Sequence, residues 1–166
     1  MAGTAWLEYS DQSPAQLVGL ASEYRTDSIV LAFETALRAK LDRVGLQSLS
    51  QAEIYVLAIE GLEREVNNGG FDQFFRNATS VFAPIVENAL EAAGLPITAD
   101  IARDALAALE LESNFSETDV RLAMQGDDED RDDMLNDLDA RFLRYEEDIA
   151  TKLFEFISAN RDQINF

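Results

Sequence analysis

The sequence contains no cysteine and no histidine among its 166 residues. Without cysteine there are no disulfides, no thiolate nucleophile and no cysteine-based zinc site. Without histidine the chain lacks the commonest general base and the commonest ligand of transition metals. Any catalysis would therefore depend on carboxylates or on Lys, Arg, Tyr, Ser or Thr side chains.

Basic residues are scarce: 13 Lys and Arg stand against 32 Asp and Glu, so the formal charge is −19 and the isoelectric point is about 4.1. A protein that binds nucleic acid directly needs a basic surface to neutralise phosphates, and anionic membranes also attract basic proteins. We therefore expect no direct binding to nucleic acid and none to membranes.

Long apolar segments are also missing. No apolar run approaches the roughly 20 residues that span a bilayer, and the first residues lack the basic and apolar regions of a secretory signal. These features, together with the absence of cysteine, fit a cytoplasmic protein.

What the chain does contain is helix-forming sequence. Apolar residues recur every three to four positions, and no alternating pattern typical of strands is found. The length and the 47% hydrophobic content favour one domain with a real core. We predict an all-α fold, a single domain over residues 1–166, with roughly seven helices.

Local signals place several of these helices. Ser50 to Glu53 form a capping box, and the apolar segment behind it predicts a central helix near residues 51–66. The Asn and Gly residues at 67–70 predict its end. We expect Asp27 and Thr98 to cap two other helices, and a helix over about residues 80–93 with Pro84 in its first turn.

The acidic residues are unevenly distributed, with 21 acidic against 7 basic residues in 84–166. The densest stretch, residues 127–139, is called here the acidic run, and Arg131 is its only base. Residues 126–133 are read as an exposed loop that runs into a helix. A charged stretch of this kind usually keeps a protein soluble. The alternative is a binding surface, for which the candidate residues are Asp127, Asp128, Glu129, Asp130, Asp132, Asp133, Asp137 and Asp139.

Carboxylates on a helix can imitate DNA. Side chains at i and i+4 lie roughly 6 Å apart, and duplex DNA presents a charge about every 1.7 Å along its axis. A rigid acidic helix could therefore occupy the basic groove of a DNA-binding protein. Its charge would also accelerate the encounter at low salt.

Two chemical alternatives also depend on carboxylates. Asp128, Asp130 and Asp132 alternate like the first ligands of a calcium loop, but Asp133 stands where Gly is required and Asp139 where a bidentate Glu is expected. A hydrolase with paired carboxylates is the other alternative, but the chain has no nucleophile motif and no phosphate-binding Gly-rich loop. We expect no metal, no cofactor and no enzymatic activity.

The segment from residue 65 to residue 77, EVNNGGFDQFFRN, resembles the signature of a bacterial family of small helical domains whose best-known member is an acidic DNA mimic. Weaker similarity at residues 89–94 and 138–142 extends the resemblance over roughly residues 25–162. The signature positions are Asn68, Gly69, Gly70, Phe71, Gln73, Phe74, Phe75 and Asn77.

The resemblance implies an all-α fold and a homodimer whose surface carboxylates stand in for DNA phosphates on a transcription factor or another DNA-binding protein. We interpret the signature itself as structural: Phe71, Phe74 and Phe75 in the core, and Asn77 as a cap of the turn. Gln73 is its one candidate for a specific contact. The phosphate-mimicking carboxylates do not follow from the signature.

The sequence therefore predicts an acidic DNA mimic that binds and sequesters a basic DNA-binding protein in competition with DNA. Three alternatives stay open. The protein could be an immunity-type inhibitor of a basic toxin such as a nuclease, a hydrolase with paired carboxylates, or a soluble dimer whose charge is only solubilising.

Overall fold

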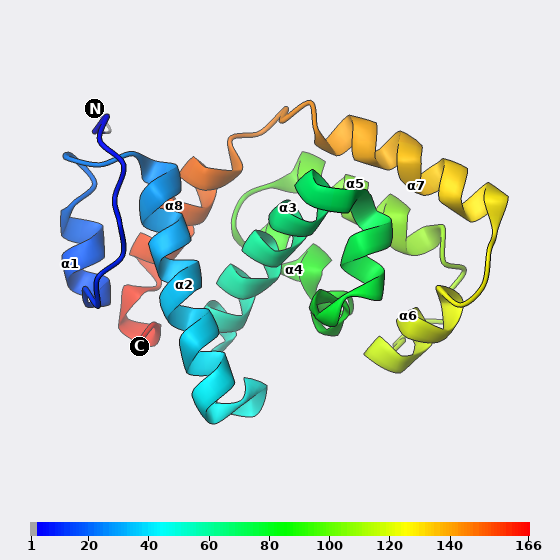
Figure 1. The fold of residues 1–166 in the computed structure, drawn as a ribbon, viewed down its shortest axis with the longest axis horizontal. Coiled ribbons are helices and arrows are strands. Elements are labelled where there is room, and N and C mark those ends of the chain that lie inside the picture. Colours follow the sequence, from blue (N-terminus) through cyan, green and yellow to red (C-terminus); the bar gives the residue numbers. More distant parts are fainter. Residues whose placement is uncertain (1–2) are drawn as a thin grey trace. The chain divides into compact units, whose positions relative to one another are not determined.

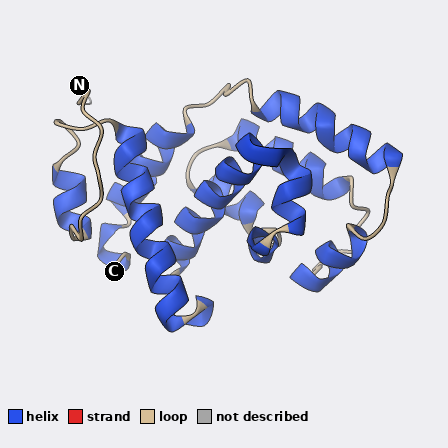
Figure 2. Ribbon diagram, viewed as in Figure 1, coloured by secondary structure: helices blue, strands red, loops and turns tan. Residues whose placement is uncertain are grey.

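The chain folds into helices joined by short connections. The computed structural model describes residues 3–166, and in that range it has eight α-helices and three short 3-10 helices (Figure 1). No strand occurs in the described part, where Ala5 and Tyr24 form only an isolated bridge (Figure 2). The predicted all-α fold is confirmed. No helix within residues 3–166 is long and apolar enough to cross a membrane.

The helices group into two compact units, one of residues up to 60 with 148–166 and the other of residues 61–147. The first unit contains α1 (Pro14–Gly19), α2 (Thr26–Val44), the first part of α3 (Gln51–Arg76) and α8 (Ile149–Ala159). α2 packs against α1 and α8. The core of the first unit includes the fully buried side chains of Leu17, Ile29, Phe33, Leu37, Leu153 and Ile157.

The second unit contains the acidic run and the signature. It consists of the remainder of α3, the 3-10 helix η2 (Ala78–Phe82), α4 (Val86–Ala92), α5 (Pro96–Ala107), α6 (Glu117–Ala123) and α7 (Glu129–Phe142). α5 packs against both α4 and α7, and α6 packs against η2. α5 therefore lies between α4 and the helix that carries most of the acidic run.

The central helix ends where the sequence predicts. α3 begins with the expected capping box, in which Ser50 Oγ accepts from the Glu53 amide and Glu53 Oε2 accepts from the Ser50 amide. The helical conformation is interrupted at Gly69 and at Gly70, whose φ is +79°. A short helix over residues 71–76 follows, and the rings of Phe71, Phe74 and Phe75 are buried as predicted.

Three predicted helix starts are wrong. α2 begins at Thr26 after Arg25, and Asp27 lies in its first turn instead of capping it. α4 begins only at Val86, because residues 78–82 form η2 and Pro84 precedes the helix. α5 begins at Pro96, so Thr98 lies inside its first turn.

The start of α5 is held by a residue far along the chain. The amides of Ile97 and Thr98 donate to the two carboxylate oxygens of Glu147, at 3.1 and 2.8 Å. These amides have no acceptor inside their own helix, so a carboxylate placed here satisfies them and also faces the positive end of the helix dipole. The cap is therefore supplied by tertiary structure.

Candidate functional site

Part of the acidic run builds the start of α7. The Asp128 carboxylate caps the helix by accepting from the Arg131 amide at 3.0 Å. Glu129, Asp130 and Asp132 occupy the first turn, where negative charge is favoured by the helix dipole. The expected exposed loop therefore ends at Asp128, and the residues behind it belong to a regular helix.

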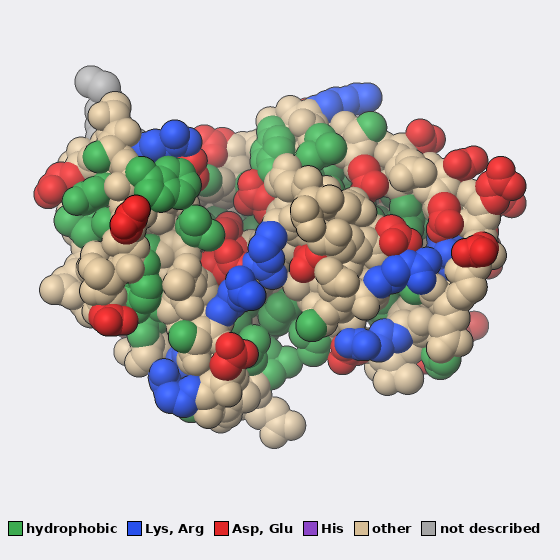
Figure 3. Space-filling view, viewed as in Figure 1, with side chains coloured by type: hydrophobic (Ala, Val, Ile, Leu, Met, Phe, Trp, Pro, Cys, Tyr) green, Lys and Arg blue, Asp and Glu red, His purple; other side chains and the backbone are tan. Residues whose placement is uncertain are grey.

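One side of α7 is buried and the opposite side carries carboxylates. Arg131, Leu135, Leu138 and Phe142 form the buried stripe, at the spacing of an amphipathic helix. The exposed carboxylates of the run are called here the acidic face, and Figure 3 shows acidic side chains gathered over the beginning of α7. The acidic face consists of Asp127, Asp128, Glu129, Asp130, Asp133 and Asp137.

The single base of the run is turned inward. The side chain of Arg131 is only 4% exposed, and its Nε donates to Asp132 at 2.9 Å. Its two terminal nitrogens donate to the carbonyl oxygens of Ala123 and Gly126, at 2.9 and 3.2 Å. Arg131 thus ties the start of α7 to the segment that follows α6, and Asp132 is its counter-ion.

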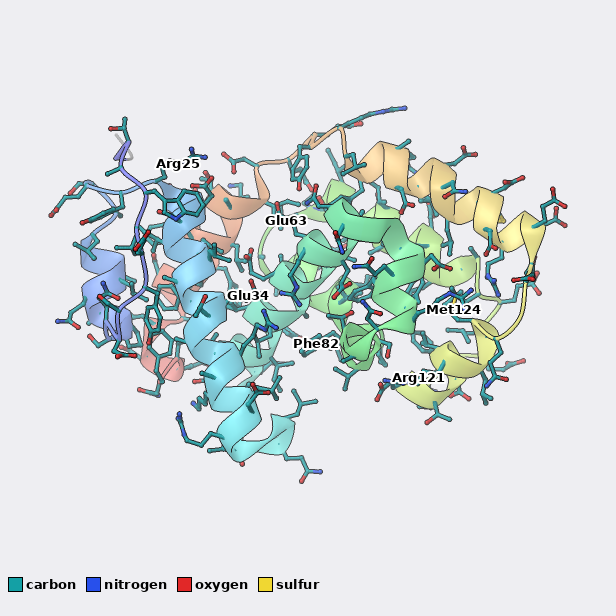
Figure 4. The ribbon with its side chains drawn as sticks, in the orientation of Figure 1. Arg25, Glu34, Glu63, Phe82, Arg121 and Met124 are labelled. Carbon is teal, nitrogen blue, oxygen red and sulfur yellow. The ribbon has the colours of Figure 1, made fainter. Side chains whose placement is uncertain are left out.

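Most of the other arginines of this unit pair with carboxylates outside the acidic face. Arg76 pairs with Asp72 on the short helix, and Arg121 pairs with Glu117 on α6, where Figure 4 labels Arg121. Further pairs join Arg103 to Glu87, Glu91 and Asp100, and Arg141 to Asp104. Within residues 3–166, no carboxylate of the acidic face has an ion-pair partner, so its charge is uncompensated.

Asp139 differs from the other acidic residues of the run. It is half-buried, and its Oδ1 accepts from the Phe71 amide at 2.7 Å. Burial raises the pKa of the Asp139 carboxyl, the hydrogen bond from Phe71 opposes this rise, and the charge of Asp72 adds to it. Because the pKa is raised, the contribution of this group to stability is greatest below its ordinary pKa and is lost as pH rises through the raised value. We predicted Asp139 as a partner-binding residue, but its carboxylate is engaged inside the fold.

Two polar residues of the signature bond to the same acidic side chain of α3. Gln73 Nε2 and Asn77 Nδ2 donate to the same oxygen of the buried Glu65, at 2.6 and 2.9 Å. Gln73, the expected candidate for a specific contact, therefore makes an internal hydrogen bond. Asn77 precedes η2 but makes no capping bond there. Glu65 was not singled out in the sequence, where the only signal is an acidic residue in a mostly apolar helix.

The calcium-loop alternative finds little support in this geometry. The calcium-loop pattern lies on a helix, where residues two positions apart point in roughly opposite directions and do not converge on an ion. No group of three or more acidic side chains in residues 3–166 could hold a metal ion. A hollow of about 180 Å³ adjoins the acidic face, and its lining includes Asp128, Asp130 and also Glu110, which is outside the predicted set.

The comparisons with known proteins identify the family. No curated protein and no solved structure matches the chain. Residues 47–160 match the family of the DMP19-like protein. The match spans α3 to α8, and so includes both the interrupted central helix and the acidic face. The chain belongs to the DMP19-like protein family.

Proposed function

We propose that this protein is an acidic DNA mimic, in which the acidic face takes the place of DNA phosphates on a basic DNA-binding protein such as a transcription factor. The observation that carries the proposal is the uncompensated charge of that face. The arginines closest in sequence are engaged by other carboxylates or by carbonyl oxygens. A basic groove would supply the missing counter-charges.

The arrangement of these charges also suits a mimic. Asp130, Asp133 and Asp137 follow one another at i, i+3 and i+7 along one side of α7. Neighbours at such spacing lie roughly 5–6 Å apart, so the helix presents a regular row of charges. Because the row is on a regular helix with a packed inner side, little order has to be gained on binding.

The remaining alternatives differ from this proposal in whether the acidic face has a partner and in what that partner is. Charge that only solubilises needs no particular arrangement, whereas here the unpaired carboxylates of the second unit are concentrated at one helix. An immunity-type inhibitor would use the same face against a basic toxin, so only the partner distinguishes it. In either case we propose a cytoplasmic, non-enzymatic binding protein without a cofactor.

The proposed function is tested by capture and competition. The immobilised protein is exposed to the cytosol of its source at low salt, and bound proteins are released by rising salt and identified. We expect a basic DNA-binding protein, released as exposed charges are screened, and displaced in proportion to added duplex DNA. A captured nuclease toxin would support the immunity-type inhibitor instead. Capture of nothing would leave only the solubilising role.

The proposal includes a homodimer. Two large apolar side chains of the second unit, Ile97 and Leu143, are 40% and 48% exposed and are available for contact with a second copy. We expect sedimentation velocity to show a species of twice the 18.4 kDa chain mass. A single 18.4 kDa species at high concentration would remove the dimer from the proposal.

A further inference from the structure

We infer that the glycine turn of the signature is a seat for α7, and that Asp139 is a positioning residue which sets the orientation of the acidic face. This inference rests on the proposed function only in the role that it gives to the acidic face. The seat consists of Gly70, Phe71, Asp139 and Phe142. Its residues come from two parts of the second unit that are far apart in the sequence.

Gly70 leaves room for α7 to approach the backbone of α3. A Cβ atom at this position would lie 2.1 Å from Asp139 Oδ2 and 2.7 Å from its Cγ, far closer than atoms can approach. The φ of +79° is also in the left-handed region, which glycine adopts at little cost. Any side chain at position 70 would therefore displace the Asp139 carboxylate from its place beside the Phe71 amide.

The contact made in that space is a charge-assisted hydrogen bond. The break at Gly69 and Gly70 leaves the Phe71 amide at the start of a new helical segment, where amides have no acceptor in their own helix. Asp139 Oδ1 supplies the acceptor at 2.7 Å. One turn further along α7, the Phe142 ring meets the Phe71 ring edge-to-face with the centroids 6.0 Å apart. The amide and the ring of one residue thus hold two successive inward positions of α7.

These contacts act together with the buried stripe of α7 to set which side of the helix faces outward. Each residue turns an α-helix by about 100°, so Asp137 and Asp139 project in roughly opposite directions. With Asp139 held against Phe71, Asp137 and Asp133 are directed to solvent, where both are exposed. Arg131 anchors the other end of the same helix to Ala123 and Gly126. Loosening the seat would let the row of carboxylates rotate or swing as a unit.

The test uses the absence of cysteine. Spin labels are attached to cysteines placed at two exposed positions, Asn136→Cys on α7 and Ala107→Cys on α5, and their distance distribution is measured by pulsed electron paramagnetic resonance. Amide hydrogen exchange of α7 is followed on the unlabelled protein. The variants are Asp139→Ala, Asp139→Asn and Gly70→Ala, with Asp137→Ala as the matched control from the exposed side.

We expect a narrow distribution of the distance between the spin labels in the parent chain and in Asp137→Ala. We expect the same in Asp139→Asn, because the amide keeps an acceptor oxygen. Asp139→Ala and Gly70→Ala should broaden it and accelerate exchange in α7 by roughly tenfold or more. Asp139→Ala and Asp139→Asn remove the same charge, so a difference between them reports positioning alone. A distribution and exchange rates in Asp139→Ala equal to those of the parent chain would overturn the inference. If Gly70→Ala does not fold, the two Asp139 variants decide the matter.

The same variants separate this inference from the proposed function. If Asp139→Ala loosens α7 and also weakens competition with duplex DNA for the captured partner, both stand. If it loosens α7 while the competition is unchanged, α7 is seated as inferred but the acidic face is not the surface that replaces DNA.

Discussion

Replacing Phe74 by Ala is expected to lower the free energy of unfolding by about 3–5 kcal/mol. The side chain is completely buried, and its ring lies 5.4 Å from that of Phe75, centroid to centroid. Removing it leaves a cavity in a well-packed core, which adds to the lost burial of apolar surface. Urea unfolding followed by circular dichroism measures the change.

The control for this prediction is Leu122→Ala. Leu122 is 56% exposed on α6, and substitutions at such positions usually change stability by about 0.5 kcal/mol or less. If Phe74→Ala costs less than about 1 kcal/mol, the ring is not part of a packed core. The assignment of the signature's phenylalanine rings to the core would then be wrong.

Neutralising the acidic face is expected to weaken partner binding by about tenfold or more. The variant combines Glu129→Gln, Asp130→Asn, Asp133→Asn and Asp137→Asn, which keep size and polarity. Each exposed ion pair contributes roughly 0.2–1 kcal/mol. Four lost pairs therefore amount to roughly 0.8–4 kcal/mol, and the middle of this range exceeds the 1.4 kcal/mol or so of a tenfold change. The loss should be mainly in the association rate and should shrink at high salt. Fluorescence anisotropy with the captured partner at two salt concentrations measures both effects.

A matched control removes four charges from the first unit through Glu8→Gln, Asp11→Asn, Asp42→Asn and Asp162→Asn. These carboxylates are exposed and have no ion-pair partner within residues 3–166, and both variants replace one Glu and three Asp. If affinity depended only on net charge, the two variants would bind equally weakly. Should the variant of the acidic face bind as tightly as the parent chain at low salt, that face is not the mimic surface. Folding of both variants should persist, because relief of repulsion offsets the small loss of helix-dipole interactions.

Some features of the acidic run can be predicted from the sequence and others cannot. The stripe of Leu135, Leu138 and Phe142 predicts which side of α7 is buried, and the structure agrees. The burial of Arg131 cannot be predicted from the sequence, since an arginine among aspartates is usually a solvent-exposed partner of its neighbours. Its burial depends on the carbonyl groups of Ala123 and Gly126, which only the turn after α6 brings within reach. Asp139 likewise reads as one more surface carboxylate until α7 is placed beside Gly70.

By itself the sequence determined the helical fold, the capping box at Ser50 and the break at Gly69 and Gly70. Each of these depends on hydrogen bonds or backbone angles within about four residues, so the residue types alone report them. Only the tertiary structure decided that Glu147 caps α5, that Asp139 holds Phe71, and which carboxylates of the run remain exposed. These contacts join residues about 50 and 70 positions apart, and the pairing of such residues is set by how helices pack, which no local pattern records.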